Sequence, residues 1–245
     1  MLGGSIGGIF KKVGKGRPSC FVISQKSVHE KYIQVMEPPF CIILLFTKWQ
    51  CGGVPLHRQF AVPFASNMTR RILETEQKAL EINLDERIYG AFAEIGAGQE
   101  VARHFFQAGA AAGTIAKTMS AYDKVVSDEI YGTEEQGKGR YVCESRLYKM
   151  LAHEYALMEG RLRTLRPEQR FFAFADTVAA INYQKTIKGD GWLGLRFQLQ
   201  PHSKPNDLVL HVRLLDQDNR LQQQAIGILG VNMLYACFRY HEDPE

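Results

Sequence analysis

Two glycines flanking Ala97 form the most suggestive chemical pattern in the sequence. An apolar segment ends just before them and a helical pattern begins at Gln99, so Gly96 and Gly98 would lie in a strand-to-helix turn. The free N–H groups and the positive dipole at a helix start attract phosphate or carboxylate, and glycine lets a ligand approach the backbone closely. We therefore predict that Gly96, Gly98 and Gln99 contact an anionic small molecule.

The same stretch also fits a tight turn that binds nothing. A dinucleotide-binding fingerprint needs a third glycine where Val101 stands, so the motif is broken. Glu94 and Glu100 would also place negative charge beside the expected anion. Both interpretations of the turn stay open from the sequence.

Lys117 and Asp176 are the two further residues that we assign to this ligand. Lys117 follows the small-residue stretch 109–113 and resembles the lysine of a phosphate loop, but the defining Gly-Lys-Ser/Thr is absent. Close helix packing through these small residues is the favoured interpretation. Asp176 follows the apolar run 171–175, and ligands of open α/β sheets gather beyond the carboxyl ends of strands. A helix N-cap explains Asp176 equally well.

Other catalytic signatures are incomplete, so we assign no catalytic residue, no metal site and no cofactor. His153 and Glu154 begin like a zinc-protease helix, but Leu157 stands where the second histidine is needed. The chain contains no G-x-S-x-G nucleophile elbow and no C-x-x-C pair. Its five cysteines lack paired spacing, which favours reduced thiols and a cytoplasmic location.

The hydrophobic pattern predicts a mixed α/β or α+β domain, in which helices flank a mixed sheet. Two alternating segments, 192–200 and 207–215, predict an antiparallel hairpin near 192–215. The other strands are expected at 88–95, 114–122 and 171–175, and helices at 99–107, 123–131, 140–165 and 219–238.

Composition changes near Met68, where a basic, glycine-rich segment gives way to a nearly neutral body. We interpret 1–67 as an extension, either a mistaken gene start or a targeting segment, and 68–245 as the α/β domain. The alternative is a native N-terminal subdomain with 40–46 as its buried strand. The run 40–46 is too short to span a membrane, and the neutral body argues against nucleic acid as a partner.

Three stretches of the body resemble an uncharacterised bacterial protein family that is common in cyanobacteria. They are Ala91–Phe106, Ala112–Asp123 and Gly227–Tyr235. The resemblance covers about 68–241. It implies that this chain is similar to the N-terminal half of a longer family member, and that this chain is truncated. Members of that family carry two inconsistent labels, nicotinate-nucleotide adenylyltransferase and TonB-dependent receptor. The chain contains no H-x-G-H for the first, and the second would need a barrel of many strands.

Two functions stay open from the sequence. The first is an interaction or scaffold-type protein, whose apolar segment 225–238 pairs with another copy or with a missing C-terminal half. The second is a nucleotide- or phosphometabolite-binding enzyme, nucleotidyltransferase-like, that uses the Gly96–Gly98 turn with Lys117 and Asp176 as polar partners. The incomplete signatures favour the first.

Overall fold

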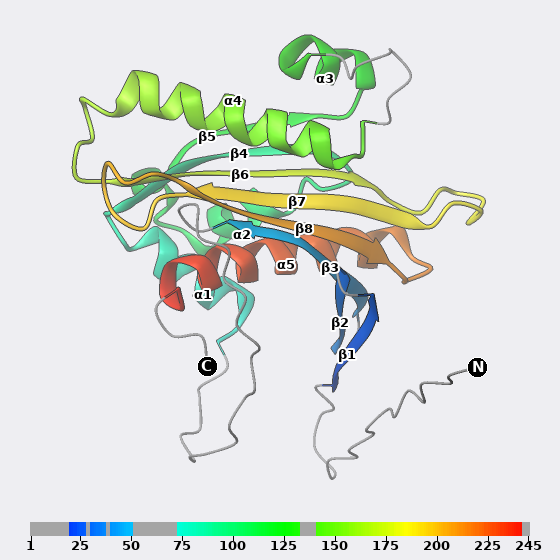
Figure 1. The fold of residues 1–245 in the computed structure, drawn as a ribbon. Helices are drawn as coiled ribbons and strands as arrows, with labels where there is room; N and C mark the ends of the chain where they lie inside the picture. The colour runs from blue at the N-terminus through cyan, green and yellow to red at the C-terminus, as the bar shows by residue number, and fades with distance from the viewer. Residues whose placement is uncertain (1–19, 28–29, 38–39, 51–72, 133–140, 242–245) are drawn as a thin grey trace, which may run out of the picture.

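The computed structural model describes residues 20–27, 30–37, 40–50, 73–132 and 141–241, with side chains for the last two ranges (Figure 1). Its eight strands form one mixed sheet in the order β1-β2-β3-β8-β7-β6-β4-β5. The strands are β1 (Cys20–Ser27), β2 (Glu30–Glu37), β3 (Phe40–Gln50), β4 (Ile88–Gly96), β5 (Ile115–Ala121), β6 (Arg170–Ala179), β7 (Gly189–Phe197) and β8 (Asn206–Leu214). The helices are α1 (Thr75–Asn83), α2 (Val101–Ala108), the short 3-10 helix η1 (Ala111–Gly113), α3 (Lys124–Tyr131), α4 (Glu144–Leu162) and α5 (Asn219–Arg239).

The parallel part of the sheet lies at its β5 end. There β4 pairs in parallel with both β5 and β6, because helical crossovers return the chain to the same end of the sheet. Strands β6, β7 and β8 then pair antiparallel, which makes the sheet mixed. The predicted mixed sheet is confirmed, and so is the predicted hairpin, as β7 and β8.

Helices cover both faces of this part of the sheet. Helix α4 packs on one face, whereas α1, α2 and α5 lie on the other (Figure 1). Every residue of β4 is buried, which explains why its sequence is apolar except for Glu94. The Phe92 ring anchors the α2 side of the core, with ring centroids 5.2 Å from Phe105 and 5.7 Å from Phe174.

The apolar segment of α5 lies inside this core. Ile226, Val231 and Leu234 are wholly buried against the sheet and its neighbouring helices. The chain's own core therefore accounts for the segment that suggested a partner. Gly230 allows close approach to α2, since a Cβ there would lie 2.4 Å from Val101 Cγ2.

Two local predictions are wrong. Asp176 neither follows a strand nor caps a helix, because β6 continues through Ala179. The small residues of 109–113 do not pack helices closely either, since a Cβ on Gly109 or Gly113 would meet no atom within 4 Å. Close packing at a small residue occurs instead at Gly230 of α5. The apolar residues around Gly230 gave no sign of this packing in the sequence.

Part of the presumed extension joins the sheet. Strands β1–β3 pair antiparallel, and β3 pairs with β8. The predicted boundary at Met68 lies outside the described residues, so the native status of 1–67 stays a prediction. Within the described part of the chain, no helix is long and apolar enough to cross a membrane.

Candidate functional site

The Gly96–Gly98 turn has the predicted strand–turn–helix geometry. β4 ends at Gly96, whose φ of +77° lies in the left-handed region that favours glycine. The Ala97 N–H donates to the Val178 carbonyl at 2.9 Å, and Gln99 Nε2 donates to the Gly96 carbonyl at 3.1 Å. The turn is thus tied to β6 before α2 begins at Val101.

The anion position at the start of α2 is occupied by a side chain of this protein. Val101 N–H donates to Glu94 Oε1 at 2.7 Å, and Ala102 N–H donates to Glu94 Oε2 at 3.3 Å. A carboxylate satisfies helix N-terminal N–H groups well. The N–H groups that we expected to be free for an external anion are therefore engaged by Glu94.

Asp176 lies beside Glu94, at the paired position on β6, and is wholly buried. Gly98 leaves room for it, since a Cβ on Gly98 would lie 2.1 Å from Asp176 Oδ1. Among the described residues, neither Asp176 carboxyl oxygen has a hydrogen-bond partner.

Burial raises the pKa of both carboxyl groups. The pKa of Glu94 rises to about 7 although the Val101 N–H lowers it, and the pKa of Asp176 lies well above its usual range because the Glu94 charge adds to burial. Two adjacent buried carboxylates repel each other and lose their hydration, and no cation offsets this cost among the described residues. We therefore expect the pair to retain a proton near neutral pH.

Lys117 lies apart from this pair. Its Nζ lies 2.7 Å from Oε2 of the buried Glu154 on α4, and Tyr131 Oη donates to the other Glu154 oxygen at 2.8 Å. Helix α4 covers the face opposite to α2 (Figure 1). The structure thus brings Gly96, Gly98, Gln99 and Asp176 together, but separates them from Lys117.

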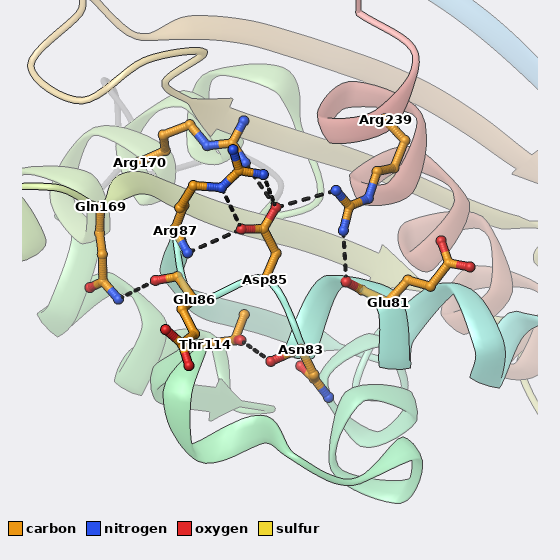
Figure 2. A network of polar contacts seen from close by, with 9 residues as sticks. All are labelled: Glu81, Asn83, Asp85, Glu86, Arg87, Thr114, Gln169, Arg170 and Arg239. Atoms are coloured by element: carbon orange, nitrogen blue, oxygen red, sulfur yellow. Dashed lines mark hydrogen bonds and ion pairs between the residues drawn. The ribbon is translucent and has the colours of Figure 1, made fainter.

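Sequence reasoning missed an arginine cluster at the opposite end of β4 and β6 (Figure 2). Arg87 donates to both oxygens of Asp85, from Nε at 2.9 Å and from Nη2 at 3.0 Å. Arg170 and Arg239 each donate to Asp85 Oδ2 at 3.2 Å. Figure 2 shows Arg87 and Arg170 on one side of the carboxylate and Arg239 on the other.

Four elements position the cluster. Asp85 and Arg87 lie in the turn between α1 and β4, Arg170 begins β6, and Arg239 ends α5. Arg239 Nη2 also donates to the Glu81 carbonyl at 2.7 Å, near the C-terminal end of α1. Asp85 and Arg87 are two positions apart, but no spacing relates them to Arg170 and Arg239. Only the folded sheet and helices bring those two arginines to Asp85.

The cations control the charge of Asp85. Burial alone would raise its pKa, but the hydrogen bonds from Arg87 and the positive charges of Arg87 and Arg170 outweigh burial and lower it to about 2. Asp85 is therefore ionised at neutral pH. Even so, three guanidinium groups share this one carboxylate, and the buried Nε atoms of Arg170 and Arg239 have no partner among the described residues.

Two hollows adjoin the cluster, and Arg87 lines both. The larger, of about 600 Å³, is lined by Glu81, Leu84, Asp85, Glu86, Arg87 and Arg239. The smaller, of about 180 Å³, is lined by Arg87, Glu168, Arg170, Leu199, Gln200 and Pro201. In residues 73–132 and 141–241, no group of three or more His, Cys, Asp or Glu side chains could hold a metal ion.

Comparisons with known proteins show similarity at the level of fold. No protein-family model matches the sequence, and no curated protein matches it either. A competence/damage-inducible protein from Agrobacterium tumefaciens has a similar structure, with 16% identity and a TM-score of 0.48 over 66% of this chain and 94% of that one. A competence-damaged (CinA) superfamily protein from Enterobacter cloacae shows 13% identity and a TM-score of 0.49 over 71% of this chain and 99% of that one. The resemblance to a cyanobacterial family stays a prediction.

Proposed function

We propose that the protein binds a small anion, such as a phosphate or carboxylate group, through Arg87 and Arg170. The observation that carries the proposal is that Arg87, Arg170 and Arg239 all share one carboxylate, Asp85, beside two open hollows. Arginine presents planar, forked donors that match the oxygens of both anions. Arg87 and Arg170 both line the smaller hollow, which has a volume of about 180 Å³.

This proposal moves the anion that we predicted to the other end of the sheet. At the Gly96–Gly98 turn, Glu94 already occupies the helix N–H groups, and Asp176 adds a second carboxyl group. Both features disfavour an external anion there. At the arginine cluster, Arg87 is 70% exposed and keeps donors for a ligand after binding Asp85.

Calorimetry with inorganic phosphate tests the proposal. We expect phosphate to bind the unmodified protein, and Arg87→Gln to weaken that binding at least tenfold by removing the most accessible guanidinium. Arg103→Gln is the matched control, because Arg103 is 63% exposed on α2 and forms an ion pair with Glu100 at 3.5 Å, away from the cluster. Absence of phosphate binding, or equal binding by the Arg87 variant, would overturn the proposal.

Self-association is a second candidate function, and α3 supports it. This helix turns polar groups inward, where the buried Arg146 binds Asp128 and the Ser127 carbonyl. Tyr131 of this helix is buried, but two of its valines face solvent: Val125 is 66% exposed and Val126 is 50% exposed. An apolar helix face in water is stabilised by covering it with a second such face.

Light scattering over a range of protein concentrations tests this candidate. We expect a dimer that Val125→Glu and Val126→Glu together convert to a monomer. Glu129→Ala, at another exposed position of α3, should leave the dimer intact. Self-association would be contradicted if the unmodified protein stayed monomeric at high concentration.

A further inference from the structure

The two hollows beside Arg87 differ in the sign of their charge. The smaller one has two guanidinium groups, from Arg87 and Arg170, and a single carboxylate, from Glu168. The larger one also has two guanidinium groups but three carboxylates, from Glu81, Asp85 and Glu86. With Arg87 counted in both, basic side chains outnumber acidic ones in the smaller hollow, and acidic side chains outnumber basic ones in the larger hollow.

The acidic side chains of the larger hollow are not all neutralised. Asp85 is shared by the three arginines, and Glu81 Oε2 accepts a hydrogen bond from Tyr235 at 2.6 Å. Glu86 differs from both: within residues 73–132 and 141–241, its backbone carbonyl accepts a hydrogen bond from Gln169 Nε2 at 2.7 Å, and its carboxylate has no ion pair. In Figure 2 the Glu86 side chain extends away from the guanidinium groups, so a cation could meet it without approaching an arginine.

We infer that the ligand is a zwitterion, with its anionic group in the smaller hollow and an ammonium group in the larger one. This inference rests on the proposed function, because the anionic end uses the same Arg87 and Arg170. The smaller hollow has room for a single phosphate or carboxylate group, and its charge is net positive. The larger hollow accepts the body of the ligand, and Glu86 pairs with the ammonium group.

Matched pairs of phosphate esters test the inference. The probes are ω-aminoalkyl phosphates of two to six carbons, each compared with the alkyl phosphate of the same length. For at least one length, we expect the amino compound to bind about two- to fivefold more tightly, the effect of one added ion pair at an exposed site. Glu86→Gln should abolish this preference while keeping the affinity for the plain alkyl phosphate.

Glu168→Gln is the matched control, because Glu168 lines the smaller hollow. Its loss should tighten the binding of both compounds and leave their ratio unchanged. If alkyl phosphates bind through Arg87 but no amino compound binds more tightly, the zwitterion inference fails and the anion site stands. A preference that survives Glu86→Gln also overturns the inference. If no phosphate ester binds, the proposed function fails first.

Discussion

The two ends of the β4–β6 strand pair stabilise buried carboxyl groups in opposite ways. At one end, Asp85 is surrounded by three arginines, and its pKa falls to about 2. At the other end, Glu94 and Asp176 lie side by side with no cation among the described residues, and burial raises the pKa of Glu94 to about 7. A buried carboxyl group must be either paired or protonated, and this sheet contains both solutions.

The two ends therefore respond to pH in opposite directions. Asp85 has a folded pKa below its unfolded value of about 3.9, so its contribution to stability is present above pH 4 and is lost as the pH falls toward 2. Glu94 and Asp176 have folded pKa values above their unfolded values. Their folded state binds more protons, and stability decreases as the pH rises from about 4 to 7.

The largest effect is expected from Asp85→Ala. This change leaves three guanidinium groups without their carboxylate, and uncompensated buried charge typically costs about 3–5 kcal/mol. Urea unfolding at pH 7 measures the loss. Glu129→Ala, which removes an exposed carboxylate of α3, should change the free energy of unfolding by less than about 0.5 kcal/mol. A similar loss of unfolding free energy in the two variants would mean that the arginine contacts of Asp85 do not stabilise the fold.

A smaller loss is expected from Gly98→Ala at the acidic end. The new Cβ would lie 2.1 Å from Asp176 Oδ1, and the buried carboxyl group has little room to move. Overpacking of this kind costs about 1–3 kcal/mol. Gly113→Ala is the control, since its Cβ would meet no atom within 4 Å. Equal unfolding midpoints for the two variants would show that Gly98 and Asp176 are farther apart than described.

Asp176→Asn should flatten the pH dependence of the free energy of unfolding. Asparagine does not ionise, and its amide can donate to the neighbouring Glu94 carboxylate. Each titrating group contributes at most about 1.4 kcal/mol per pH unit, so the slope of unfolding free energy between pH 5 and 7 should become less negative by up to that amount. Glu129→Gln should keep the original slope. An unchanged slope in Asp176→Asn would show that the pair does not share a proton.

The sequence predicted most elements because their patterns are local. The apolar run of β4, the alternation in β7 and β8 and the break at Gly96 each follow from residues close in the chain. The predicted turn was correct in shape, but its ligand position was taken by Glu94. A side chain that folds back from the preceding strand onto α2 could not be recognised from spacing alone.

The arginine cluster could not be predicted for a different reason. Asp85 and Arg239 are separated by 154 positions, and Asp85 and Arg170 by 85. Their meeting depends on the sheet order, which places β4 beside β6, and on α5 returning across that sheet. Single arginines at element ends are common in sequences, so they gave no signal before these elements were assembled.

The smallest effect on stability is expected from Arg87→Gln, although it should have the largest effect on anion binding. The Arg87 side chain is 70% exposed, and exposed ion pairs contribute about 0–1 kcal/mol. Asp85 keeps Arg170 and Arg239 in this variant, so the cluster should stay folded. Urea unfolding, measured beside phosphate binding, separates the two roles. If Arg87→Gln lowered the free energy of unfolding as much as Asp85→Ala, Arg87 would be needed for the fold itself. Its contact with Asp85 would then be a structural one despite its exposure to solvent.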